Sequence, residues 1–203
     1  TKHYGIYLKP SGTLSQGTDY GDKNSIFRYV EKLRKRAYLV NRLDKETEGL
    51  IIVAYDSRTQ NFFQEMWKKG VTKKYQAIVL GEMSGKGTLN EKINTKESTT
   101  HYECIKVVDN KSYMDISIET GRKHQIRAHC NHVGCSIIGD TKYISKTHRD
   151  MKNLYQFSFN MHLHAREIGV PDIEGITLRI KAPIPDHMLD IVEALKLSKD
   201  ILN

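Results

Sequence analysis

Three short segments of the chain combine charged and aromatic side chains that could act on a bound substrate. They are Arg42-Leu43-Asp44, Lys73-Lys74-Tyr75 and residues 121–127, which read Gly-Arg-Lys-His-Gln-Ile-Arg. Asp44 offers a carboxylate that can attack a carbon or take a proton, and Tyr75 offers a stacking face and a hydroxyl. An arginine such as Arg127 within about 4–6 Å would favour the ionised form of that carboxylate. Taken singly each segment is unspecific, since an arginine close to an aspartate is most often a surface pair.

Apolar patterns indicate the elements that must position these segments. The β-branched run 50–54, bounded by Gly49 and Asp56, predicts a buried strand shortly after Asp44. Strands are also predicted at 4–8, 75–80, 100–109, 113–118 and 177–180. Helices are predicted after the N-cap residues Asn24 and Ser57, at 125–133 and at 185–195, with Ile26, Phe27, Val30 and Leu33 recurring at helical spacing in the first. Hairpin-like strand runs with scattered helices favour an α+β domain over a regular βαβ alternation.

Composition narrows the class of partner. The net charge is +8 and the pI about 9.3, which favours an acidic partner such as nucleic acid. The longest apolar run is far shorter than the roughly 20 residues that span a bilayer, so we expect no membrane association. Three cysteines form no even-numbered framework, which predicts free thiols and a reducing compartment. The chain begins at Thr1 without an initiator Met, which indicates a trimmed or processed chain. We expect a cytoplasmic protein, or one of an organelle matrix if an upstream targeting segment was removed.

The order of the three segments carries a family resemblance. Residues 41–49 read Asn-Arg-Leu-Asp-Lys-Glu-Thr-Glu-Gly, then come Lys74-Tyr75-Gln76-Ala77 and the 121–127 segment. In this order they resemble the RluA-like pseudouridine synthases. The resemblance extends over nearly the whole chain, through Lys9-Pro10-Ser11-Gly12, Gly139-Asp140 with Tyr143, Leu163-His164-Ala165 and Ala182-Pro183-Ile184-Pro185.

The resemblance implies a fold, an activity and a set of site residues. The fold is a curved mixed, mainly antiparallel β-sheet with flanking helices, with residues 1–203 as a single catalytic domain. The activity is isomerisation of specific uridines in structured rRNA or tRNA to pseudouridine, by a chain expected to act as a monomer. Asp44 matches the catalytic aspartate, Tyr75 the active-site tyrosine, and Arg127 the arginine that pairs with the carboxylate. Arg42 matches the arginine associated with the space that a flipped base vacates. The expected RNA contacts are Arg42, Arg122, Lys123, His124 and Gln125.

The reaction itself explains these residue types. Pseudouridine formation breaks the C1′–N1 bond, turns the uracil and joins C5 to C1′, so no atom or electron enters or leaves, and we expect no cofactor and no metal. The chemistry needs a carboxylate beside the ribose, either to attack C1′ or to take a proton from C2′. The uridine must first leave the RNA stack, at a cost of a few kcal/mol.

Departures from the family pattern and other readings stay open. Asn41 stands where the family usually has histidine, Glu48 where it often has serine, and Ile144 where glycine is common. A catalytically silent RNA-binding relative is one alternative. A metal-dependent RNA hydrolase is another, with potential ligands His124, His129, Cys130, His132 and Cys135. However, no Cys-x-x-Cys pair exists, and Ile126, Cys130 and Val133 would share a core-facing side of a helix.

Basic groups at 32–36, 68–74 and 142–149 provide candidate phosphate contacts, although a solvated surface is the commoner role for any one such group.

Overall fold

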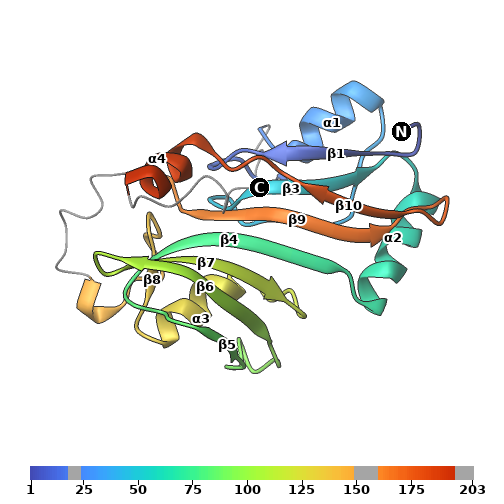
Figure 1. The fold of residues 1–203 in the computed structure, drawn as a ribbon. Helices are drawn as coiled ribbons and strands as arrows, with labels where there is room; N and C mark the ends of the chain where they lie inside the picture. Colours follow the sequence, from blue (N-terminus) through green and yellow to red (C-terminus); the bar gives the residue numbers. More distant parts are fainter. Residues whose placement is uncertain (18–23, 149–159, 195–203) are drawn as a thin grey trace. The chain divides into compact units, whose positions relative to one another are not determined.

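The computed structural model describes residues 1–17, 24–148 and 160–194, and the chain divides into two compact units (Figure 1). The first comprises residues 1–73 and 165–182, and the second residues 74–164 and 183–203. The boundaries fall inside two strands, β4 (Thr72–Leu80) and β9 (Leu163–Pro171). The described residues contain α-helices and mostly antiparallel strands, which confirms the expected α+β class.

The first unit is organised around β3 (Glu48–Ala54). This strand pairs antiparallel with β1 (Tyr4–Lys9) and with β2 (Tyr38–Leu39), while β10 (Thr177–Lys181) pairs with β9. The helices among its described residues are α1 (Ile26–Arg34) and α2 (Ser57–Lys69). Ile51 and Val53 pack in one cluster with α1, whereas Leu50 and Ile52 pack in another with Phe63 of α2. Burial of both faces explains why β3 reads as a continuous apolar run.

The second unit repeats this plan around β4. Its strands are β4, β5 (Lys86–Leu89), β6 (Thr100–Val108), β7 (Lys111–Ile118) and β8 (Ser136–Ile137), and its helices are α3 (Gln125–His132), a 3₁₀ turn at Lys146–His148 and α4 (Asp186–Ala194). Ala77 and Val79 of β4 pack in one cluster with residues of α3, and Ile78 and Leu80 pack in another with residues of α4. As in β3, the apolar run that predicted this strand contributes side chains to two hydrophobic clusters.

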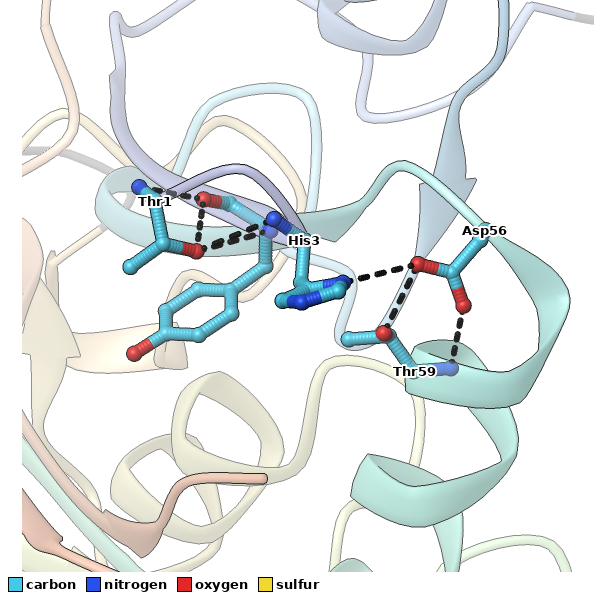
Figure 2. A network of polar contacts seen from close by, with 5 residues as sticks. Thr1, His3, Asp56 and Thr59 are labelled. Carbon is cyan, nitrogen blue, oxygen red and sulfur yellow. Dashed lines mark hydrogen bonds and ion pairs between the residues drawn. The ribbon is translucent and has the colours of Figure 1, made fainter. Parts of the chain in front are cut away.

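Two helix starts differ by one residue from the prediction. Ser25 caps α1 by accepting from the Arg28 N–H at 3.3 Å, in place of Asn24. Asp56 caps α2 in place of Ser57, because its carboxylate accepts from the Thr59 N–H at 2.7 Å and the Thr59 hydroxyl at 2.9 Å (Figure 2). The Thr59 N–H holds the pKa of Asp56 below its usual range. Asn, Ser and Asp all cap helices well, so composition alone could not choose between neighbours.

Two predicted core positions are exposed. Leu33 is 58% exposed because the apolar partners of α1 meet only its first two turns, through Ile26 and Val30. Val133 is 43% exposed because it follows the last residue of α3, so it does not share a core face with Ile126 and Cys130. Leu195 and Arg149 lie outside the described residues. No helix in the described part of the chain is long and apolar enough to span a membrane.

The start of β3 should tolerate only glycine. Gly49 has φ +119°, and a Cβ there would overlap the backbone of Ala165. We predict that Gly49→Ala lowers the free energy of unfolding by about 2–4 kcal/mol, because both the backbone and the neighbouring strand would have to shift. Urea unfolding would measure this change. Gly121→Ala is the matched control, since a Cβ at Gly121 meets open space; equal stability of the two variants would contradict the constraint.

Candidate active site

Asp44 lies in the loop 41–47, which joins β2 to β3. The end of β1 and the segment that follows it hold the backbone of this loop with three side chains. Lys9 Nζ donates to the Lys45 carbonyl at 2.9 Å, and Ser11 Oγ donates to the Glu46 carbonyl at 2.8 Å. Ser15 Oγ donates to the Leu43 carbonyl at 2.8 Å and accepts from the Leu43 N–H at 2.9 Å. Both residues that flank Asp44 are therefore fixed through their main chain.

Lys9 is the most deeply buried of these supports, with 1% of its surface exposed. Its Nζ also donates to the carbonyls of Pro10 at 2.9 Å and Thr13 at 2.6 Å, so the ammonium has three carbonyl acceptors. Burial lowers the pKa of Lys9 to about 8, while the carboxylates of Glu46, Glu48 and Asp44 act to raise it. A buried cation thus ties the end of β1 to the loop that carries the candidate catalytic carboxylate.

Asn41 fixes the other end of the loop. Its Nδ2 donates to the Leu50 carbonyl at 3.2 Å, and its Oδ1 accepts from the Ile52 N–H at 2.8 Å. The amide supplies the donor and acceptor that this stretch of β3 requires, which gives the expected departure from histidine a structural role. Arg42, the next residue, is exposed.

Tyr75 lies on β4, opposite Ile116 of β7. Its ring is partly buried against the core cluster that includes Ala77 and Ile116. Packing against this cluster and the pairing of β4 with β7 restrict the position of Tyr75, which stays partly exposed to solvent.

Arg127 of α3 makes a buried two-pronged ion pair with Asp140. Arg127 Nε lies 2.7 Å from Asp140 Oδ2, and Nη2 lies 2.8 Å from Oδ1. Asp140 also accepts from the N–H groups of Lys142 and Tyr143. Burial alone would raise the pKa of Asp140, but the hydrogen bonds from Arg127 and from the two N–H groups hold it below its usual range. The guanidinium therefore has a fixed orientation.

Two aromatic side chains extend this arrangement. The guanidinium of Arg127 lies 5.2 Å from the ring centre of Tyr143, and the Tyr143 hydroxyl lies 3.1 Å from Nδ1 of His124. Asp44 belongs to the first unit, whereas Tyr75 and Arg127 belong to the second. The expected pairing of Arg127 with Asp44 stays a prediction.

The residues expected to contact RNA before α3 divide into two kinds. Lys123 is exposed, and Arg122 donates through Nε to the Glu97 carbonyl at 2.9 Å. Gln125, by contrast, is 3% exposed. Its amide donates to Thr99 and Thr100 and accepts from Thr120 and the Arg122 N–H. The polar groups of Gln125 thus hold the turn that precedes the helix. Its expected contact with RNA stays a prediction.

His129, one of the potential metal ligands on α3, has protein partners of its own. His129 is buried, with Nδ1 at 2.8 Å from Thr100 Oγ1 and Nε2 at 2.9 Å from the Glu91 carbonyl. The cysteines are free thiols, as predicted, and burial raises the pKa of Cys130 to about 12. Within residues 1–17, 24–148 and 160–194, no three His, Cys, Asp or Glu side chains gather as metal ligands would. The metal-dependent alternative thus has no site there.

Comparison with known sequences decides the family. A family model described as RNA pseudouridylate synthase matches residues 3–132, a stretch that includes Asp44, Tyr75 and Arg127. The chain belongs to this family. Among curated relatives, ribosomal large subunit pseudouridine synthase D of Salmonella typhimurium is 29% identical over 197 residues, which are 85% of this chain and 60% of the relative. The Escherichia coli K12 protein of the same name is 29% identical over 198 residues, with the same coverage. The chain thus spans about 60% of the length of these relatives.

Solved structures show the same fold for this chain. Human RNA pseudouridylate synthase domain containing 4 is 22% identical with a TM-score of 0.75, over 98% of this chain and 92% of that chain. Human RNA pseudouridylate synthase domain containing 1 is 19% identical with a TM-score of 0.75, over 98% and 93%. These likenesses confirm the mixed, mostly antiparallel architecture with flanking helices.

Sequence reasoning missed several residues that support these side chains. Lys9 and Asp140 stand in motifs that carried the resemblance, yet neither had an assigned role, and Ser15 had no signal at all. The useful signal for Lys9 was its position, since a lysine that ends a buried strand must find partners for its ammonium.

Burial of Lys9 should be visible in the pH dependence of stability. The folded chain releases this proton near pH 8, whereas an unfolded lysine releases it near pH 10.4. Between these values the unfolded state binds more protons, so the contribution of Lys9 to the free energy of unfolding rises with pH, by up to about 3 kcal/mol. In Lys9→Met this rise should be absent. Urea unfolding of both proteins from pH 7 to pH 10 measures the difference, and parallel profiles would show that Lys9 is not buried in this way.

Proposed function

We propose that this chain isomerises uridine to pseudouridine in RNA, with Asp44 as the catalytic carboxylate. The observation that carries the proposal is the support of the Asp44 loop. Leu43 and Lys45 are held through their main chain by Ser15 and Lys9, while the side of the loop that bears Asp44 and Arg42 keeps access to solvent. A carboxylate that must meet one face of a ribose needs such a rigid base.

The chemistry follows from the residues named. Asp44 either attacks C1′ or removes a proton from C2′, the C1′–N1 bond breaks, and the uracil turns and bonds to C1′ through C5. The hydrogen at C5 leaves as a proton in the last step. Arg127 is the cation that would hold Asp44 ionised, and Asp140 keeps the guanidinium in one orientation. Tyr75 offers the uracil a stacking face, and Arg42 fills the gap that the extruded base leaves.

The substrate we propose is ribosomal RNA, with tRNA as the other structured RNA to test. Support comes from the two bacterial relatives, whose names assign them to the large ribosomal subunit. We further propose that the chain acts as a monomer. Mapping of pseudouridines in cellular RNA with and without the protein would identify the uridine, and unchanged rRNA would contradict this choice.

Replacing Asp44 tests the central assignment. We expect Asp44→Asn to lower turnover by orders of magnitude, because an amide keeps the shape of the carboxylate but is neither a useful nucleophile nor a base. The measurement is release of tritium from C5-labelled uridine in RNA, with a thermal melt of the same preparation. Asp109→Asn makes the same chemical change in an exposed turn and should retain full activity.

Three outcomes separate the competing readings. Substantial tritium release by folded Asp44→Asn would contradict the catalytic role of Asp44. Tritium release absent from the unaltered protein, with RNA binding intact, would favour the catalytically silent relative. Cleavage of the RNA that is lost after treatment with a chelator would favour the metal-dependent hydrolase.

Tyr75→Phe separates stacking from proton transfer. Phenylalanine keeps the aromatic face and removes the hydroxyl, so we expect RNA affinity within about twofold of the original and a marked fall in kcat if the hydroxyl moves a proton. Single-turnover rates at saturating RNA measure that step directly. Full activity would assign Tyr75 to stacking alone.

A further inference from the structure

One face of helix α1 packs against the first unit, and the other face is exposed to solvent. Ile26 and Val30 pack into the first unit against Ile51 and Val53. On the outer side, Tyr29 is 59% exposed and Leu33, one turn further on, is 58% exposed. Single exposed apolar residues need no explanation, but an aromatic and an aliphatic side chain spaced i, i+4 form a continuous patch on a helix surface.

The surroundings of this patch are strongly basic. Residues 28–36 include five arginines and lysines and one carboxylate, Glu31. Glu31 is engaged by Arg28, with Arg28 Nη1 at 2.6 Å from its Oε2, and Arg34 lies over the ring of Tyr55 at 4.8 Å. Lys32, Lys35 and Arg36 are exposed beside Tyr29 and Leu33. The field of the outer face is therefore positive, which favours a polyanion over an apolar or basic partner.

The position of α1 links this face to the Asp44 loop. The Ile26 N–H donates to the Leu14 carbonyl at 3.0 Å, and the Phe27 N–H donates to the Ser15 carbonyl at 3.1 Å. Ser15 in turn holds Leu43, the neighbour of Asp44. The first turn of α1 is thus bonded to the segment that holds the Asp44 loop, and the basic residues follow along and just beyond a helix about 13 Å long, on the scale of a few nucleotides.

We propose that the outer face of α1 is a second RNA-binding surface, which takes unpaired nucleotides flanking the target uridine. One base stacks on Tyr29, Leu33 supports the stack, and Lys32, Lys35 and Arg36 contact the phosphates. An aromatic ring set among cations is the arrangement by which proteins bind single-stranded nucleic acid. The surface deepens the proposed function and rests on it only for the identity of the RNA.

Binding to a labelled oligouridylate of about 20 nucleotides tests the surface with the whole chain. We expect Tyr29→Ala to weaken binding about tenfold, the loss of one stacked base, and Tyr29→Phe to bind as the original does. Lys32→Gln with Arg36→Gln should weaken binding and reduce the slope of log affinity against log salt by about 1.4, or about 0.7 for each phosphate contact. Lys86→Gln with Lys96→Gln removes the same charge from exposed sites of the second unit and should leave the slope unchanged.

The outcomes are distinguishable from failure of the proposed function. With C5-labelled RNA, the α1 variants should raise KM and leave kcat unchanged, because the reacting groups are intact. Unchanged affinity in Tyr29→Ala would overturn the stacking role. An equal change of slope in the Lys86/Lys96 control would reduce the surface to general charge attraction and overturn it as a site. Absent tritium release from the unaltered protein would refute the proposed activity, while the oligouridylate titration would still decide the surface.

Discussion

The arrangement of the first unit depends on how the loop around Asp44 satisfies its backbone. Residues 41–47 lie between two strands and lack a ladder of their own, so their carbonyl and N–H groups must find other partners. The ammonium of Lys9 and the hydroxyls of Ser11 and Ser15 supply those partners from one side, and the amide of Asn41 anchors β3 on the other. Burying an ammonium is costly, and three carbonyl acceptors and three nearby carboxylates offset that cost.

The second unit solves a related problem with an ion pair. Arg127 is buried on α3, so its guanidinium requires a partner that matches its planar fork, and Asp140 provides both oxygens. The carboxylate is in turn fixed by two N–H groups of the following turn. Such a pair adds little net stability because desolvation opposes the Coulomb attraction. The consequence of the pair is a fixed orientation of the guanidinium. A second carboxylate would have to approach the guanidinium in that orientation.

The accuracy of the predictions made from the sequence depended on the kind of sequence pattern behind each one. The runs 50–54 and 75–80 gave strands correctly, because both are packed by helices on each face and leave long apolar stretches. The caps at Asn24 and Ser57 were misplaced by one residue, since their neighbours cap equally well. The burial of Gln125 was not predicted, because a polar side chain that faces a ligand and one that satisfies a buried turn look alike in sequence. The roles of Lys9 and Ser15 depend on carbonyls at positions 45 and 43, which only the folded chain brings near.

The same reasoning explains why α1 can combine structural and binding roles. Its inner face packs against Ile51 and Val53 through Ile26 and Val30, in the first two turns of the helix. Leu33, near the end of the helix, is therefore exposed to solvent. Its first turn, however, is bonded to Leu14 and Ser15, and Ser15 is bonded to Leu43. A strand of RNA held on the outer face would therefore be held by the same rigid body that fixes Asp44. Errors in the placement of the strand would not accumulate through a flexible joint. Binding energy gained on α1 would be the same in the ground state and the transition state, so it would lower KM and leave kcat unchanged.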